Sequence, residues 1–162
     1  MCLDLMLREH SYLFGFLQGD GHLEGGKGNR GKLTVSIKWE DRSLLRRFKC
    51  LFPEVNSSIT KRVRDTSFKD SFASATWTVC NMEFRIGLKT LGLPEGKKSL
   101  IVAPPRTEYH VVDYMRGWID ADGSIGTTQE GYPFISLAVS SEAMKIAYSQ
   151  FLCDLTGEVK KV

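Results

Sequence analysis

The chain has 162 residues, 42% hydrophobic and 25% charged, with a net charge of +3. This is the composition of a globular protein, with room for one domain or two small ones. No apolar run approaches the ~20 residues of a membrane span, and the first residues lack the basic stretch of a signal peptide. We therefore expect an intracellular, soluble protein and exclude a membrane-bound or secreted one; cytoplasm, nucleus and organelle stay open.

Two segments of similar sequence each predict an apolar helix that ends in Asp-Gly. They are residues 13–21 (LFGFLQGDG) and residues 115–123 (MRGWIDADG). We expect each helix to end at its last glycine, because glycine takes the left-handed conformation that closes a helix. Asp20 and Asp122, 102 residues apart, then lie at the carbonyl end of a helix dipole, where a carboxylate is disfavoured. A positive group should compensate each of them.

Strands are predicted between these two segments. Residues 32–39 and 73–80 alternate apolar with polar side chains, which is typical of half-buried strands, and residues 59–64 supply another strand. Residues 25–31 (GGKGNRG) form the tip of the first hairpin. We expect this glycine-rich tip to be flexible and to follow a DNA backbone.

Basic residues gather on these strands. Residues 22–64 contain eleven Lys or Arg against four acids, a clustering that indicates a nucleic-acid partner. The polar faces carry hydroxyls and lysines, and a β-ribbon with such side chains fits the major groove. The predicted DNA-binding residues are Lys27, Arg30, Lys32, Thr34, Ser36, Lys38, Lys61, Arg62, Arg64, Ser74, Thr76 and Thr78.

Helices fill the remaining segments. Asp41 can cap a helix that is stopped by Pro53, and Asn81 can cap another that ends at Gly92. The predicted order up to about residue 93 is thus helix, hairpin, helix, hairpin, helix. Thr107 can cap the second Asp-Gly helix.

The repeat extends beyond the Asp-Gly helices. At the same offset of 102, residues 35–40 fall on residues 137–142, which indicates two copies of one small domain. We assign residues 1–103 to the first copy, 104–106 to a linker and 107–162 to the second. Small residues four apart, Gly15 with Gly19 and Gly117 with Ala121, allow the two helices to approach closely. Such a pair brings the two acids together.

Both segments resemble the LAGLIDADG motif of homing endonucleases. The resemblance implies an α+β fold of tandem αββαββα repeats, in which antiparallel sheets form a DNA-binding saddle and the motif helices pair at the domain interface. It implies a site-specific double-strand DNA endonuclease that hydrolyses phosphodiesters with a divalent metal. The partner would be double-stranded DNA with a long asymmetric target, and no membrane is involved.

The resemblance also implies functional residues. Asp20 and Asp122 correspond to the metal-binding acids, with Gly19 and Ala121 beside them, and Mg²⁺ is the expected cofactor, for which Mn²⁺ can substitute. Hard cations of this kind prefer carboxylate and carbonyl oxygens. Lys98, or alternatively Lys97, corresponds to a lysine that stabilises charge on the scissile phosphate. The catalytic set is therefore Asp20, Asp122 and Lys98.

Departures from the family pattern leave two alternatives open. Gln18 replaces the first acid of the motif, whereas Asp120 keeps it, and the strand ends carry Trp39 and Ser141, neither of which positions water well. One alternative is a catalytically weak or inactive DNA- or RNA-binding relative, such as a maturase or regulator. The other is a structural interaction domain.

The second copy is shorter than the first. At the offset of 102, Val162 corresponds to Thr60, so the second copy lacks a second hairpin, the later helix and the lysine loop. We expect its first hairpin to have an unpaired edge and its helices an uncovered apolar face. The sequence then predicts part of a longer, monomeric protein or a decayed gene product. Self-association, in which a second chain completes the sheet, is the competing expectation.

Overall fold

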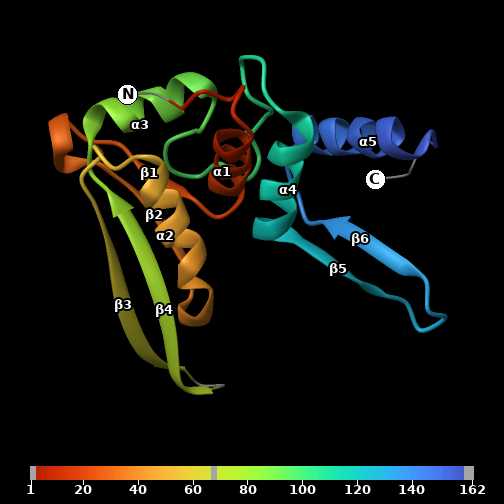
Figure 1. Ribbon diagram of the computed structural model, residues 1–162, viewed down its shortest axis with the longest axis horizontal. Coiled ribbons are helices and arrows are strands. Elements are labelled where there is room, and N and C mark those ends of the chain that lie inside the picture. Colours follow the sequence, from red (N-terminus) through yellow and green to blue (C-terminus); the bar gives the residue numbers. More distant parts are fainter. Residues whose placement is uncertain (1–2, 67–68, 159–162) are drawn as a thin grey trace.

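The computed structural model describes residues 3–66 and 69–158, and Figure 1 shows their arrangement. None of the helices in these residues is both long and apolar enough to cross a bilayer. The elements in chain order are α1 (Arg8–Gly19), β1 (His22–Glu24), η1 (Gly28–Arg30), β2 (Lys32–Lys38), η2 (Trp39–Asp41), α2 (Arg42–Leu51), β3 (Ser57–Thr66), β4 (Lys69–Val79), α3 (Met82–Leu91), α4 (Val111–Asp122), β5 (Gly123–Thr127), β6 (Pro133–Leu137) and α5 (Glu142–Thr156).

The first seven helices and strands, apart from the 3₁₀ turns, form one complete αββαββα unit, as the sequence predicts. Its antiparallel sheet has the order β1-β2-β4-β3, and α1, α2 and α3 lie on one side of it (Figure 1). Alternation along β2 and β4 buries Leu33, Val35 and Trp77 on that side. Trp77 meets Phe48 and Phe84 at ring-centroid distances of 6.1 and 6.5 Å, so an aromatic cluster joins the sheet to its helices.

The remaining elements form a smaller unit of helix, hairpin and helix. The strands β5 and β6 make a separate two-stranded sheet, which diverges from the first sheet on the other side of the α1–α4 pair (Figure 1). The expectation of two αββαββα repeats is therefore met by one complete unit only. Ile125 and Ile135 on this sheet are 73% and 44% exposed, whereas Leu33, the counterpart of Ile135, is fully buried. The described residues thus leave an apolar face of β5–β6 uncovered.

The two motif helices pack backbone to backbone. A Cβ on Gly15 would lie 2.1 Å from the carbonyl oxygen of Tyr114, and a Cβ on Gly117 would lie 2.1 Å from that of Tyr12. Real Cβ atoms do not approach oxygens so closely, and only glycine permits this crossing. The small-residue spacing therefore predicted the α1–α4 pair correctly.

The ends of the motif helices differ from the prediction. Neither Gly21 nor Gly123 has a positive φ; glycine is required there by space, because a Cβ would lie 2.5 Å from the carbonyl oxygen of Leu17 or Ile119. The second helix also begins later than expected, since α4 starts after His110 and Thr107 does not cap it.

The other two predicted helices are confirmed with one correction. Asn81 Oδ1 accepts a hydrogen bond from the Phe84 amide at 2.8 Å, and Gly92 ends α3 with a φ of +112°. Asp41 stands at the start of α2, but its side chain makes no capping hydrogen bond.

The glycine-rich tip between β1 and β2 makes hydrogen bonds to the start of α3, while its flexibility stays a prediction. Asn29 Oδ1 accepts a hydrogen bond from the Met82 amide at 3.0 Å, and the Arg85 guanidinium donates to the Gly28 carbonyl. These bonds fasten the tip to the start of α3. Lys27 and Arg30 nevertheless stay exposed.

Candidate functional site

The ends of α1 and α4 bring Asp20 and Asp122 to one place. A Cβ on Gly19 would lie 2.5 Å from the Cβ of Ala121 and 3.1 Å from Asp122 Oδ2. The Asp122 carboxylate therefore lies against the last turn of α1, next to Asp20. Glycine at position 19 is what leaves room for it.

A lysine reaches these acids from the loop after α3. Lys98 Nζ donates a hydrogen bond to the Gly19 carbonyl, whereas Lys97 is exposed to solvent. Lys98 and Asp122 share a cavity of about 230 Å³. Of the two lysines left open by the sequence, the structure brings Lys98 to the acids.

The pKa values reflect this crowding of charge. Burial and the nearby Asp122 charge raise the pKa of Asp20 to about 6, against the opposing effect of Lys98. Burial also raises the pKa of Asp122, again opposed by Lys98. Burial lowers the pKa of Lys98, while both acids oppose that change. Two carboxylates with raised pKa values and one lysine leave an excess negative charge that a bound cation would relieve.

The donor set fits a hard divalent cation only in part. Among the residues that the structure describes, no group of three His, Cys, Asp or Glu side chains could hold a metal ion. The Gly19 carbonyl already accepts a hydrogen bond from Lys98, and Ala121 packs at the helix crossing. Two carboxylates remain, and Mg²⁺ commonly takes one or two of them with its other ligands from water and phosphate.

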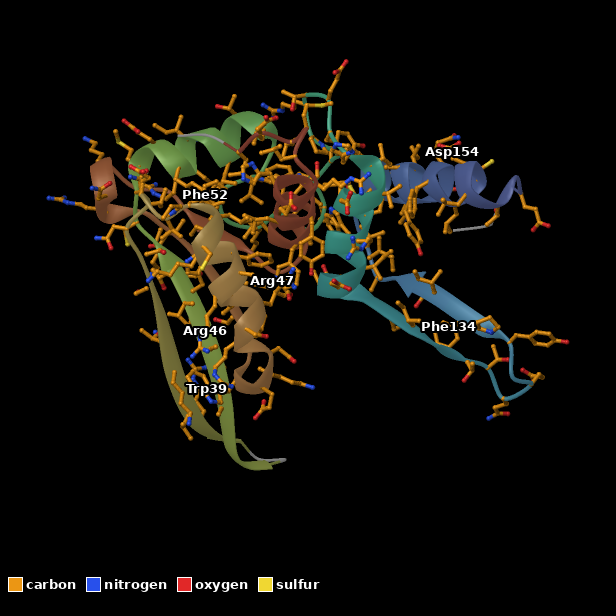
Figure 2. All side chains as sticks on the ribbon, viewed as in Figure 1. Trp39, Arg46, Arg47, Phe52, Phe134 and Asp154 are labelled. Atoms are coloured by element: carbon orange, nitrogen blue, oxygen red, sulfur yellow. The ribbon has the colours of Figure 1, made fainter. Side chains whose placement is uncertain are left out.

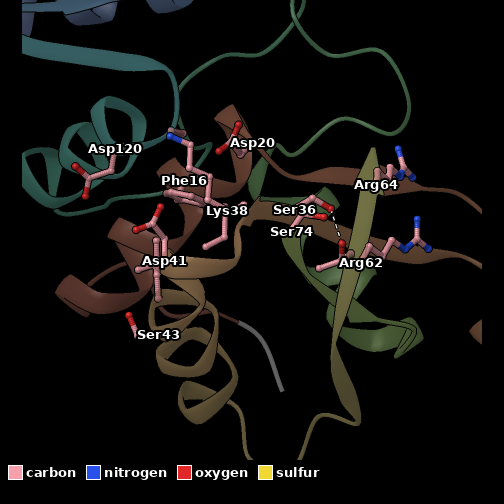
Figure 3. Close-up of a pocket in the computed structure, with 14 residues that line it drawn as sticks. Phe16, Asp20, Ser36, Lys38, Asp41, Ser43, Arg62, Arg64, Ser74 and Asp120 are labelled. Carbon is pink, nitrogen blue, oxygen red and sulfur yellow. Dashed lines mark hydrogen bonds between the residues drawn. The ribbon is translucent and has the colours of Figure 1, made fainter. Parts of the chain in front are cut away.

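A larger cavity opens on the Asp20 side, between the helix ends and the sheet. It has a volume of about 970 Å³ and is lined by acids and bases together (Figure 3). Its charged residues are Asp20, Lys38, Asp41, Arg62, Arg64 and Asp120. The first acid of the second motif is fixed here, because Tyr12 Oη donates a hydrogen bond to Asp120 Oδ2 at 2.7 Å.

The sequence did not predict that two of these acids, Asp41 and Asp120, line the cavity. Asp41 was assigned to a helix cap, yet it lies two residues past the predicted strand end and lines the cavity.

The two strand-end residues, Trp39 and Ser141, do not line this cavity. Arg42 and Lys61 sit over the Trp39 ring at 4.6 and 4.9 Å, and Ser141 Oγ donates to the Val102 carbonyl. A short turn added to the end of the predicted strand 32–39 would have indicated the position of Asp41.

Gln18, which replaces a motif acid, lines the same cavity as Lys98 and Asp122, but its polar atoms are engaged elsewhere. Its amide nitrogen donates to the Gly92 and Ala103 carbonyls at 3.2 and 2.9 Å, and its oxygen accepts from the Tyr114 hydroxyl. Gln18 is fully buried. It therefore ties α1 to α4 and to the chain that leads between them.

The outer face of the first sheet gathers most of the predicted DNA-binding residues. Cross-strand pairs place Thr34 beside Thr78, Ser36 beside Thr76 and Lys38 beside Ser74, and β3 places Arg62 beside Ser74 and Lys61 beside Ala75. Lys32 and Arg64 follow by alternation. Lys61 is the exception, since its partner Ala75 is buried and its ammonium lies over Trp39.

No protein-family model and no curated protein matches the chain. The fold is similar to that of the homing endonuclease I-WcaI bound to its DNA recognition sequence, with a TM-score of 0.63 and 14% identity over 95% of this chain and 69% of that one. It is also similar to the N-terminal LAGLIDADG domain of DUF199/WhiA, with a TM-score of 0.54 and 16% identity over 96% of this chain and 69% of that one.

These similarities establish the fold. The chain has a LAGLIDADG-like α+β fold, which is shared by proteins as different as a homing endonuclease and WhiA. The LAGLIDADG-like α+β fold that the two Asp-Gly segments implied is thus confirmed, whereas the expected tandem pair of complete repeats is not. Function must be argued from the site, because one fold hosts many activities.

Proposed function

We propose that the chain is a metal-dependent, site-specific endonuclease of double-stranded DNA. The observation that carries the proposal is the meeting of Asp20, Asp122 and Lys98 at the end of the α1–α4 pair, beside a sheet face of hydroxyls and cations. A lone acid at a helix end is a weak signal, but two acids with raised pKa values and a lysine are typical of a catalytic centre.

In this proposal Asp20 and Asp122 would hold Mg²⁺ or Mn²⁺ at the ends of α1 and α4, beside Gly19 and Ala121. A divalent ion supplies Lewis acidity and lowers the pKa of bound water. Lys98 would stabilise the negative charge that develops on the scissile phosphate.

The first sheet would position the DNA. Arg62, Arg64 and Lys38 face the same cavity as Asp20, so phosphates held there would lie near the acids. Hydroxyls of Ser36, Thr76 and their neighbours would contact base edges. We keep residues 1–103 and 107–162 as the two units of the protein, joined by residues 104–106, and a long asymmetric target as the substrate.

Selection of cleaved sites from a random DNA library tests this proposal. Mg²⁺ should support cutting of both strands, and Ca²⁺ should support binding without cutting. Asp20→Asn and Asp122→Asn should each abolish cutting while DNA affinity stays within about threefold, since neither change removes a phosphate contact. Asp154→Asn on α5, where Asp154 accepts a hydrogen bond from Gln150, is the matched control. Cutting that survives both substitutions would exclude this active site.

A second candidate is a DNA- or RNA-binding protein that does not cut. Two observations support it. Lys98 Nζ already donates a hydrogen bond to the Gly19 carbonyl, and the described residues offer no third side chain that could bind a metal ion. Such a protein would bind nucleic acid with the same steep salt dependence but would yield no product with Mg²⁺ or Mn²⁺. The selection above separates the two candidates.

A further inference from the structure

The two sheets of the molecule differ in charge. Residues 123–137, which contain β5, β6 and their turn, include no Lys or Arg and one acid, Glu130. Over residues 111–158 there are two basic residues against seven acids. The outer face of the first sheet, by contrast, presents Lys38, Arg62 and Arg64 around one cavity.

The two basic residues among residues 111–158 are already paired. Arg116 contacts Asp113 at 2.9 Å, and Lys145 contacts Glu142 at 3.1 Å. Each pair lies three residues apart on its own helix. Neither cation stands on the β5–β6 hairpin, so a phosphate held there would meet no cation that belongs to residues 123–137.

The exposed polar side chains of the smaller hairpin, among them Thr127, Gln129 and Tyr132, carry no positive charge. Ser124 and Ser136 hydrogen-bond to each other at 2.8 Å. Phe134 is 42% exposed, and its ring covers Gly126, where a Cβ would lie 2.9 Å from the ring. Figure 2 shows Phe134 out on this hairpin, beyond the α1–α4 pair from Arg46 and Arg47. An apolar ring at this place contacts no phosphate.

We infer that this chain binds DNA through only one of its two sheets. The first sheet holds the duplex by its phosphates and base edges, while the smaller unit adds Asp122 to the active centre and almost no binding free energy. The inference rests on the proposed function, because it concerns DNA bound at that site. Its physical basis is that phosphate neutralisation supplies most of protein–DNA affinity, and a net negative surface opposes it.

One-sided binding has a clear signature in sequence preference. Bases that the protein selects should all lie on one side of the Asp20–Asp122 centre, over the first sheet. On the other side, base changes should alter binding by less than about twofold, since residues 123–137 supply no cation that would hold the phosphates beside those bases. A protein with two equal reading sheets would instead select bases on both sides of the centre.

The test uses the full chain and a library of random-sequence duplexes, selected for binding in Ca²⁺ and then sequenced. Two double variants are compared on the selected duplex by fluorescence polarisation. Arg62→Ala with Arg64→Ala should weaken binding roughly tenfold or more and reduce the salt slope by about two. Ser124→Ala with Phe134→Ala on the smaller hairpin should change neither by more than about twofold. Equal thermal unfolding midpoints would show that both variants fold.

The outcomes separate this inference from the proposed function. A one-sided preference without cutting would uphold the inference and refute the endonuclease proposal. Preference on both sides of the centre, or an equal loss of affinity in the two double variants, would overturn the inference while leaving the endonuclease intact. Absence of salt-dependent DNA binding would overturn both.

Discussion

The paired acids lead to a prediction about stability: Asp20→Asn should make the metal-free protein more stable at pH 8. Burial and the Asp122 charge raise the pKa of Asp20 from 3.8 to about 6. The folded state therefore binds this proton more tightly than the unfolded state does. Stability present below pH 3.8 is lost as the pH rises through about 6. Asparagine removes the ionisation and with it the loss.

The size of the effect follows from the pKa. A carboxyl raised from 3.8 to about 6 costs the folded state up to about 3 kcal/mol once it is ionised, at about 1.4 kcal/mol for each tenfold change. Asp20 is exposed to solvent, and solvent screening reduces this cost to roughly 1 kcal/mol. For a chain of this size, that corresponds to a rise in Tm of about 2–4 °C.

Thermal unfolding of both proteins at pH 4 and pH 8 measures the prediction. The difference in Tm should be present at pH 8 and should shrink at pH 4. Mg²⁺ should then raise the Tm of the wild type and leave that of Asp20→Asn nearly unchanged, because the variant has lost one of the two proposed carboxylate ligands. Glu54→Gln, in the exposed turn before β3, is the charge-matched control. If Asp20→Asn were less stable than the wild type at pH 8 without metal, our account of the site electrostatics would be wrong.

Three further predictions concern other parts of the molecule. Gly117→Ala places a Cβ 2.1 Å from a backbone oxygen of the facing helix and should lower the free energy of unfolding by about 1–3 kcal/mol or more, as measured by urea unfolding. As the control, Gly25→Ala meets only the end of a flexible side chain at 3.1 Å and should lower it by less than about 0.5 kcal/mol. Lys98→Gln removes the charge that holds down the pKa of both acids, so the acid limb of the pH profile for cleavage should move to higher pH; an unmoved limb would place the lysine outside the site. Arg62→Ala should reduce the salt slope of DNA binding by about one, and Lys61→Ala, on the opposite face of the strand, should leave it unchanged; equal effects would mean that the face assignment is wrong.

Much of the first unit was predictable because its signals are local. Alternation in β2 and β4, the Asn81 cap and the Gly92 stop each depend on side chains within a few residues. The face of Lys61 was harder, because β3 lies at the sheet edge and its charged residues stand on both faces. Only the pairing of Lys61 with the buried Ala75 decides it, and that register is a tertiary property.

The candidate site divides in the same way. Asp20 and Asp122 were visible as a repeated pair, and the glycine spacing correctly predicted that their helices meet. Asp41 and Asp120 were missed because only the fold shows that α1, η2 and α4 border one cavity. The choice of Lys98 over Lys97 also needed the path of the loop after α3.

Gln18 shows that the role of a motif residue depends on its surroundings as well as on its residue type. An acid at this buried position would lie against the carbonyl oxygens of Gly92 and Ala103, which require donors. An unpaired buried carbonyl costs about 1–3 kcal/mol, and a carboxylate there would add charge repulsion. The amide supplies two donors and also accepts from the Tyr114 hydroxyl. The change from acid to amide therefore fits the helix interface, and the aspartate two residues later is the one to which we assign the proposed chemistry.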